Sequence, residues 1–381
     1  MAIDLSLTAE HKLFREAIRR FAEHEIAPIA REYDEREEYP VHILKKLGEM
    51  GYLGVKFPRK LGGAGADTVT AAIMAEELGY ASAGIFLGIY VHVFLALNAI
   101  ARFGTEAQQR DYLAPGIRGG KIGAWAFAEP DAGSDPGAMT TRAVRDGDGY
   151  RLNGTKLYIT NGSIADFVVV TAVTDPEQGM KGLSLFIVDR EAPGFAVARR
   201  LKKLGVRASD TAELVFQDCW VGADQLLGEE NVGFANAMRT LTEGRIMSAA
   251  FALGVARAAF DQSLSHAKGR VAFGQPIGQF QGIQWIFADM ALELEAAKLL
   301  TWQAAWLADQ GLPHIKEASM AKLYATEMCA RIAGQAVLLH GGSGFMMDSD
   351  IQRFYRDCKV LEIGEGTSHI QRNTIARQLG L

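Results

Sequence analysis

The sequence predicts an α+β protein in which a helical domain (residues 1–120), an antiparallel β domain (121–230) and a second helical domain (231–381) follow one another. Three observations predict this order. Apolar residues recur at helical spacing in the first part, β-rich runs fill the second, and long helical patterns return in the third. No long helical pattern separates the predicted strands, so we expect an antiparallel rather than a doubly wound sheet.

The predicted helices of the first part begin with an amphipathic segment. Leu13, Ala17 and Phe21 share one helical face, and Thr8 is placed to cap the start of that helix. Helical periodicity continues through residues 41–50, 68–78 and 81–103. The most apolar stretch, residues 79–100, is interrupted by Ser82, His92 and Asn98, and we interpret it as a core helix rather than a membrane span.

The predicted strands of the second part are short. They cover residues 124–128, 150–152, 156–159, 167–173, 183–188 and 213–216. Asn153-Gly154 lies between two of these runs and predicts a hairpin, because both residues tolerate the positive φ of a type I′ turn. In the third part, long helical patterns are predicted at residues 236–267, 284–310 and 315–340.

Composition limits the classes of function. The chain has 381 residues, 49% hydrophobic and 22% charged, with a formal net charge of −5, which suits a globular enzyme and argues against a nucleic-acid partner. Cys219, Cys329 and Cys358 form no CxxC pair, which fits a reducing compartment, and no tight histidine spacing predicts a metal site. A helical pattern starts so near the N-terminus that no signal peptide is predicted, and we expect a cytoplasmic location.

Three glycine-containing stretches, at residues 125–135, 156–162 and 362–372, suggest chemistry. None fits GxGxxG, and the chain has no GxSxG elbow or P-loop, so the commonest NAD-enzyme, hydrolase and kinase interpretations are not supported. The first stretch turns beside the hydroxyl of Ser134. The second ends in Tyr158-x-Thr160, which puts an aromatic ring and a hydroxyl on one side of a strand.

The third stretch places Glu365 between Gly364 and Gly366, ahead of a terminal helical run. The two glycines leave room for a ligand against the backbone. A carboxylate desolvated there by an apolar ligand would have a raised pKa and could act as a general base. Taken singly, each of the three stretches is more simply explained as a polar loop, a half-buried strand or a helix cap with a solvated glutamate.

Taken together, these segments resemble the acyl-CoA dehydrogenase family, from Leu7 to Leu381. One family signature is recognisable at residues 126–137 and a second at 338–357. Between and after them lie Tyr-Ile-Thr-Asn-Gly at 158–162, Arg-x-x-Phe-Gly at 270–274 and the terminal Glu-Gly-Thr-Ser. The resemblance implies two helical domains enclosing a β domain, with a four-helix bundle at the C-terminus, assembled as a homotetramer (a dimer of dimers) that binds FAD.

The resemblance also implies the residues that hold FAD. The flavin ring would be lined by Trp125, Phe127, Ala128, Ser134, Tyr158, Ile159 and Thr160. The neighbouring subunit would hold the pyrophosphate and adenine end with Arg270, Phe273, Gln281, Leu338, His340, Gly341 and Gly342. Thr367, Ser368 and His369 would meet the phosphates at a helix N-terminus, where unpaired N–H groups favour anions.

On the substrate side, the resemblance implies that Glu365 removes the α-proton of a saturated acyl-CoA while FAD takes the β-hydrogen as hydride, giving a trans-2-enoyl-CoA. Ser134 would touch the thioester tail, and Thr242 to Arg245 match the family's CoA-contacting helix start. Some family members carry the base at the position of Gly244. Glu243 is adjacent, but one residue on a helix turns a side chain about 100° away.

Four positions depart from the usual family residues. Ala128 stands where Ser or Thr is usual, Tyr158 where Trp is common, Leu338 where Gln is common and Thr242 where Asp is usual. None of these changes removes a group that the reaction needs. They put in question the strength of individual contacts to FAD and CoA.

The substrate implied is an apolar acyl-CoA. No Lys or Arg occurs between Lys60 and Arg102, where the family forms much of its acyl pocket, so a buried substrate carboxylate would find no partner. Gly364 stands where a bulky Tyr is often found before the base, which favours branching near the α-carbon. The expected substrate is a short, medium or branched acyl-CoA from fatty-acid or amino-acid breakdown. The acceptor implied is electron-transfer flavoprotein. Two alternatives stay open: another flavin reaction on a CoA thioester (oxidase, enoyl-CoA reductase or desulfinase), and a non-catalytic acyl-CoA or flavin-binding scaffold.

Overall fold

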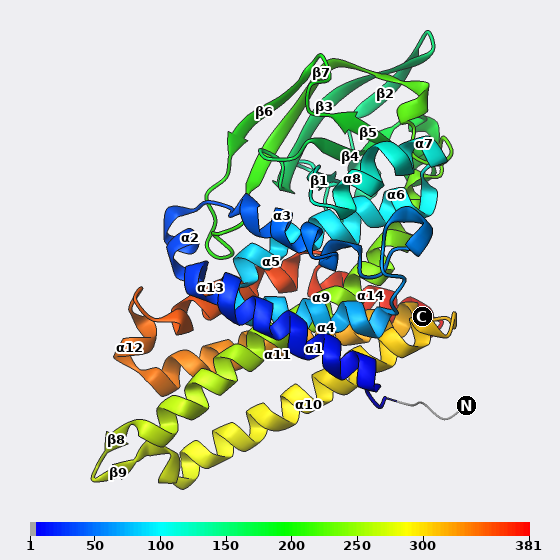
Figure 1. Ribbon diagram of the computed structural model, residues 1–381. Coiled ribbons are helices and arrows are strands. Elements are labelled where there is room, and N and C mark those ends of the chain that lie inside the picture. The colour runs from blue at the N-terminus through cyan, green and yellow to red at the C-terminus, as the bar shows by residue number, and fades with distance from the viewer. Residues whose placement is uncertain (1–4) are drawn as a thin grey trace.

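The computed structural model describes residues 5–381, so the first four residues of the predicted 1–120 domain lie outside the described part. Helices, then a sheet, then helices follow along the chain, as the sequence predicts. The sheet lies at one end of the molecule and the long C-terminal helices at the other, with N-terminal helices between and beside them (Figure 1). The predicted α+β class is confirmed.

The N-terminal helices pack their apolar faces into the largest core. They are α1 (Ala9–Phe21), α2 (Ala30–Arg36), α3 (Val41–Glu49), α4 (Thr68–Ala81), α5 (Ala83–Tyr90), the π-helical segment η5 (Val91–Leu97), α6 (Asn98–Phe103), α7 (Glu106–Gln108), the π-helical η6 (Gln109–Leu113) and α8 (Ala114–Ile117). Thr8 caps α1, as predicted, because its hydroxyl accepts a hydrogen bond from the His11 N–H at 3.2 Å.

The segment from Ala83 to Phe103 is long and apolar enough to cross a membrane by length and composition alone. In the described chain its most apolar window is entirely buried within the protein, as the interpretation of this stretch as a core helix requires. The same segment supplies part of the wall of the candidate active site described below.

The sheet contains seven strands: β1 (Gly123–Ala126), β2 (Arg142–Asp146), β3 (Gly149–Thr160), β4 (Phe167–Val173), β5 (Leu183–Asp189), β6 (Phe195–Arg200) and β7 (Thr211–Gly222). Their order is β1-β4-β2-β3-β7-β6, and β5 pairs with β4. Most pairs are antiparallel, but β4 runs parallel to both β1 and β2, so the sheet is mixed at that edge. The sequence analysis missed β2 and β6.

The hairpin predicted at Asn153-Gly154 is wrong. These residues lie inside the continuous strand β3, where its register against β7 shifts. The Asn153 side chain bridges this irregularity by exchanging hydrogen bonds of 2.9 and 3.1 Å with Asp218. Gly154 is needed for close packing, because a Cβ there would lie 2.4 Å from the hydroxyl of Thr141. The turn lies instead between β2 and β3, at Gly147, which has a φ of +63°.

The C-terminal part is built on three long helices, α9 (Gly233–Gly269), α10 (Gln281–Asp309) and α11 (Ile315–His340). The two short strands β8 (Val271–Ala272) and β9 (Gln275–Pro276) join α9 to α10. Shorter helices complete the part: α12 (Gly342–Phe345), α13 (Asp350–Ile363) and α14 (Ser368–Gln378). α9 is the central element, since it packs against α11, α4 and α10.

Candidate active site

Glu365 lies in the short connection between α13 and α14 with a left-handed φ of +60°. The backbone around it is fixed from two helices. The Gln371 amide on α14 donates to the carbonyl oxygens of both Glu365 and Gly366 at 2.9 Å. The Lys322 ammonium on α11 donates to the Gly366 carbonyl at 2.8 Å. Thr367 caps α14 through the Ile370 N–H, so the loop that carries Glu365 has one defined shape.

The Glu365 carboxylate points into the protein. Its Oε2 atom is buried and has no hydrogen-bond partner among residues 5–381. Burial raises the pKa of Glu365 to about 7, against the opposing effects of Arg245, Lys322 and Tyr90. A carboxylate with a pKa near the working pH and a free oxygen is suited to take up a proton.

Gly244 on α9 makes the space for this carboxylate. A Cβ at Gly244 would lie 2.8 Å from Glu365 Oε2, 3.1 Å from the Tyr90 hydroxyl and 3.3 Å from a methyl of Leu95. The family's alternative base position is therefore directly opposite the glutamate that is present. Glu243, one residue earlier, lies on another face of the helix, as predicted.

Glu243 is engaged elsewhere. Its carboxylate forms ion pairs with Lys56 and Arg102 and accepts a hydrogen bond from Asn98 at 3.3 Å. It is therefore no competitor for the position beside Gly244.

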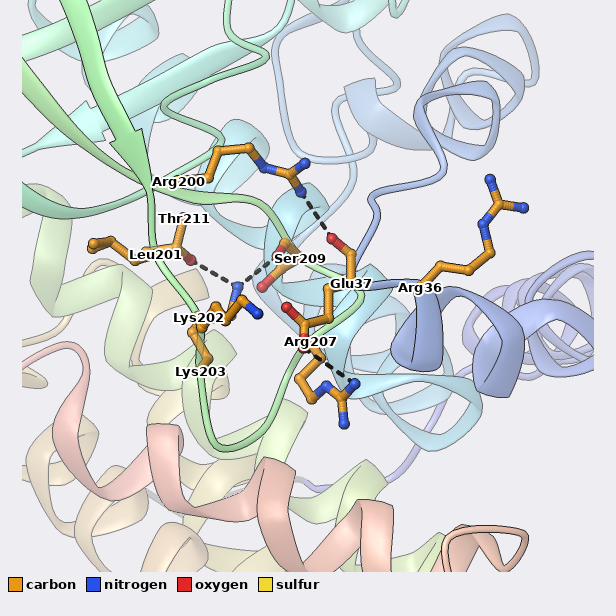
Figure 2. A pocket seen from close by; sticks show the side chains of 9 residues that line it. All are labelled: Arg36, Glu37, Arg200, Leu201, Lys202, Lys203, Arg207, Ser209 and Thr211. Atoms are coloured by element: carbon orange, nitrogen blue, oxygen red, sulfur yellow. Dashed lines mark hydrogen bonds and ion pairs between the residues drawn. The ribbon is translucent and has the colours of Figure 1, made fainter.

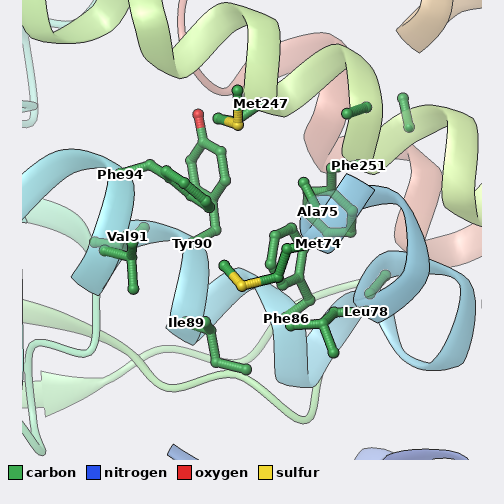
Figure 3. Close-up of a cluster of buried hydrophobic side chains, with 14 of the residues drawn as sticks. Met74, Ala75, Leu78, Phe86, Ile89, Tyr90, Val91, Phe94, Met247 and Phe251 are labelled. Carbon is green, nitrogen blue, oxygen red and sulfur yellow. The ribbon is translucent and has the colours of Figure 1, made fainter. Parts of the chain in front are cut away.

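Aromatic side chains pack around Tyr90, whose hydroxyl lies close to Glu365 beside Gly244 (Figure 3). The ring of Phe86 lies 4.8 Å from that of Phe251 and 6.2 Å from that of Tyr90, and Phe94 lies 5.8 Å from Tyr90. All four rings are at most 3% exposed. The Tyr90 hydroxyl points toward α9 and donates to the Gly244 carbonyl at 2.9 Å.

The structure brings the first two glycine-containing stretches together. The Phe127 carbonyl accepts from Lys156 at 3.1 Å, and the Ala128 carbonyl accepts from the Leu157 N–H at 2.9 Å. The loop after β1 is thereby joined to β3 just before its end. The predicted flavin-ring residues of both stretches differ in exposure: Trp125 and Ile159 are buried, Phe127, Ala128 and Thr160 are half-buried, and Ser134 and Tyr158 are exposed.

A buried ion pair under this loop was not anticipated from the sequence. Lys156 and Glu129 are 2.8 Å apart, with side chains 0% and 2% exposed. The backbone N–H groups of Thr140 and Thr141 also donate to Glu129. Lys156 lowers the pKa of Glu129 to about 2, against the opposing effect of burial, and the pair anchors the loop that carries Ser134.

The second predicted set of FAD contacts is not brought near Glu365 in one chain. Arg245, which faces Glu365, and Arg270 both belong to or cap α9, and the 25 residues between them span about 37 Å at the helical rise. His340 stacks on His266 near that far end, with ring centroids 4.1 Å apart. The remaining members lie exposed or half-buried at the same end: Phe273, Gln281, Leu338, Gly341 and Gly342.

Two segments were predicted to lie at the N-termini of helices, and the structure bears this out for one of them. Thr367 is the N-cap of α14, with Ser368 and His369 in its first turn, as the resemblance implies. Thr242 to Arg245, by contrast, do not form a helix start, because α9 begins at Gly233 and places them in its third turn. The Thr242 hydroxyl donates to the Met238 carbonyl within the helix.

Three residues at the site were missed by the sequence analysis: Tyr90, Lys322 and Gln371. Each contacts the Glu365 loop or its surroundings from a different helix; Tyr90 and Lys322 lie outside the glycine-containing stretches, and Gln371 lies within the third one without having been singled out. Of the three, Lys322 had a signal in the sequence: it lies within the apolar helical pattern of residues 315–340, which predicts a buried cation but not its hydrogen-bond partner.

Two cavities lie elsewhere, and neither is lined by a predicted site residue. One, of about 230 Å³, is basic (Figure 2). Three of its cations are already held by protein acceptors: Arg200 by the Glu37 carbonyl, Arg207 by the Glu37 carboxylate, and Lys203 by Ser209 and Thr211. Among the described residues, no group of three or more His, Cys, Asp or Glu could hold a metal ion.

Comparison with known proteins places the chain. The N-terminal, middle and C-terminal domain models of acyl-CoA dehydrogenase match residues 8–120, 124–219 and 231–380. The short-chain-specific acyl-CoA dehydrogenase of Clostridium acetobutylicum is 42% identical over 377 residues, covering 99% of this chain and 100% of that protein.

Solved structures agree with this similarity. Butyryl-CoA dehydrogenase from Megasphaera elsdenii superposes with a TM-score of 0.97 at 38% identity over 100% of both chains. A chain from a structural study of the electron transferring flavoprotein of Acidaminococcus fermentans superposes with a TM-score of 0.97 at 40% identity over 99% of both chains.

Proposed function

This chain belongs to the acyl-CoA dehydrogenase family and is an oxidoreductase that dehydrogenates acyl-CoA, and we propose that its substrates are short saturated acyl-CoA thioesters, with FAD as cofactor and Glu365 as base. The observation that carries the assignment of the base is the Glu365 carboxylate, whose Oε2 atom is buried beside Gly244 without a hydrogen-bond partner among residues 5–381. A non-catalytic scaffold has no use for a carboxylate kept out of water. The relatives' names favour dehydrogenation over the other flavin reactions.

The residues present fit FAD. Tyr158 is 67% exposed at the end of β3, although aromatic rings are usually covered, and it offers a face for a flat ring beside Trp125 and Thr160. The N-terminus of α14, capped by Thr367, offers backbone N–H groups to phosphate. At the far end of α9, His340 Nε2 is buried without a partner among residues 5–381, a polar group suited to a ligand contact.

Glu365 carries the proton step. Its carboxylate takes the α-proton, and the fixed backbone around Gly366 keeps it aimed at one point beside Gly244. Burial raises the pKa of Glu365 to about 7, so a substantial fraction of the base is ionised at neutral pH and nearly all of it at alkaline pH. FAD, when bound, supplies the acceptor for the β-hydrogen. A positioned base contributes on the order of 10²–10⁴-fold to the rate.

The short-chain proposal rests on the aromatic wall. Phe86, Phe94 and Phe251 pack closely around Tyr90, whose hydroxyl lies beside Glu365. A long acyl chain would have to displace them, and a tightly packed core resists such repacking. The names of the short-chain and butyryl-CoA relatives support the same proposal.

We propose that the active form is a homotetramer. Because α9 separates the two sets of predicted FAD contacts by about 37 Å, a single chain does not bring both sets to one site, whereas a second copy would supply the missing set. Trp285, Leu292 and Leu299 recur every seven residues on α10 and are 62%, 69% and 46% exposed, forming an apolar stripe that a second copy would cover.

The acceptor and location remain proposals. The similarity to a chain from a study of an electron transferring flavoprotein supports such a flavoprotein as electron acceptor. The cytoplasm is supported by three cysteines that are all buried and unpaired.

The test is anaerobic titration of the purified holoenzyme with saturated acyl-CoAs of increasing chain length, followed by the visible flavin spectrum. We expect bleaching with four-carbon and six-carbon substrates and little bleaching with sixteen-carbon ones. Bleaching by long chains alone would refute the short-chain proposal. A bound flavin that stays oxidised with every saturated thioester would refute the proposed substrate class.

A further inference from the structure

Tyr90 occupies a position that the proposed reaction does not by itself explain. It is the last residue of α5, its side chain is 3% exposed, and three aromatic rings hold it in place. A purely structural tyrosine would pack equally well as phenylalanine. Here the hydroxyl donates to the carbonyl of Gly244 on α9. Gly244 is also the residue whose missing side chain makes room for the Glu365 carboxylate.

The Tyr90 hydroxyl and Glu365 Oε2 converge on the same point. Both lie within 3.1 Å of the position that a Cβ on Gly244 would occupy. The hydroxyl now donates to the Gly244 carbonyl at 2.9 Å, and Glu365 Oε2 has no donor in good hydrogen-bond geometry among the described residues, although the Tyr90 hydroxyl lies near enough to lower the pKa of Glu365. The Gly244 carbonyl belongs to a helix, where it also has an intrahelical donor available, so it does not depend on Tyr90.

We propose that Tyr90 is a positioning residue for the base: its hydroxyl donates to the Glu365 carboxylate when the base is ionised, and to the Gly244 carbonyl when the base holds a proton. Rotation of one O–H bond and a small movement of the Glu365 side chain connect the two states. The inference rests on the proposed role of Glu365.

The surrounding charges agree with this assignment. The groups that face Glu365 are Arg245 from α9, Lys322 from α11 and Tyr90 from α5, and Glu362 on α13 acts on Lys322. Burial and the neighbouring Glu365 raise the pKa of Tyr90 well above its usual value, so the phenol keeps its proton and can serve as a donor. Of the three groups, Tyr90 is the one that is neutral, so it can stabilise the ionised base without a fixed charge.

The first test needs no substrate. Thermal midpoints of the holoenzyme are measured from pH 5 to 9 for the wild type, Tyr90→Phe, Glu365→Gln and the double variant. We expect the two substitutions to be coupled by about 2 °C at pH 8.5, where Glu365 is ionised, and uncoupled at pH 5. The matched control is Tyr112→Phe, which removes a buried hydroxyl that donates to Asp189 at 2.9 Å. Absence of coupling at pH 8.5 would overturn the proposal.

The second test uses the reductive half-reaction with butyryl-CoA. In Tyr90→Phe the acid limb of the rate profile should move up by about one pH unit, with substrate affinity within about threefold of wild type. 3-Fluorotyrosine at position 90 is a stronger donor and should move the limb down. If the acid limb of the pH–rate profile does not move in Tyr90→Phe, the proposal is overturned. If the two substitutions are coupled in the first test but butyryl-CoA does not reduce the flavin of the wild type, the proposed role of Tyr90 is supported and the proposed substrate is refuted.

Discussion

Replacing Glu365 with glutamine should remove most of the catalytic rate and, at alkaline pH, make the protein more stable. Glutamine keeps the size of the side chain but cannot take up a proton. Because a positioned base contributes on the order of 10²–10⁴-fold, we expect the rate of flavin reduction to fall by about that factor. FAD should stay bound, since the side chain of Glu365 faces Gly244 on α9.

The gain in stability follows from the pKa of Glu365. Burial raises this pKa from 4.5 to about 7, so the folded protein holds a proton that the unfolded chain has lost between those two values. The stabilisation is fully present below pH 4.5 and is lost as the pH rises through 7. At 1.36 kcal/mol for each pKa unit, the loss is about 3 kcal/mol, which corresponds to about 4 °C for a chain of this length.

The assay is the difference in thermal midpoint between Glu365→Gln and wild type across pH 5 to 8.5, alongside anaerobic stopped-flow reduction. The difference should grow with pH in favour of the variant and level off above pH 8. Glu362→Gln is the matched control, because its carboxylate pairs with Lys359 near the surface. It should change neither quantity by much. A difference that does not depend on pH would refute the reasoning about burial, and retained turnover would refute Glu365 as the base.

Two further substitutions test the surroundings of the base. Gly244→Ala should lower the rate of flavin reduction about tenfold, because the added Cβ crowds the Glu365 carboxylate. Its thermal stability should not fall, because alanine favours the helix. The control is Gly334→Ala, whose Cβ would meet only one ring atom, at 3.8 Å, and which should leave the rate unchanged. Lys156→Met should lower the free energy of unfolding by about 3–5 kcal/mol at pH 8 and by less near pH 4, because it leaves the Glu129 carboxylate buried without its cation. The exposed Lys12→Met is the control in thermal melts, and an equal effect of both lysine substitutions would contradict the argument.

The fold could be predicted where burial leaves a periodic pattern. Helix α11 has the predicted limits, Ile315 to His340, because its apolar residues alternate with polar ones at a steady helical period. Strand β4 was predicted equally well from a continuous apolar run at residues 167–173. β2 and β6 were missed because most of their residues are exposed or half-buried, so their sequences lack the alternation of a half-buried strand.

The site could be predicted only in part, for a different reason. Glu365 stands out because two glycines flank it in the chain. The residues that control its pKa and its direction come from four helices, and Tyr90 is 275 residues away in sequence from the base it faces. Asn153-Gly154 shows the opposite error. The local pattern predicted a turn strongly, but the glycine at position 154 is required by close packing against Thr141. Contacts between distant segments carry no local signature.

The loop that carries the base combines features that each cost stability. A left-handed φ at a non-glycine residue costs roughly 1–2 kcal/mol, and a buried carboxylate oxygen without a partner adds to this. The hydrogen bonds from Lys322 and Gln371 offset these costs by holding the backbone carbonyls rather than the carboxylate. The fixed contacts are therefore made to the main chain, and the reactive group keeps only the exchangeable contact proposed for Tyr90. A substitution that gave the carboxylate a permanent partner should stabilise the fold and slow proton abstraction, since the base would have to break that bond before it could act.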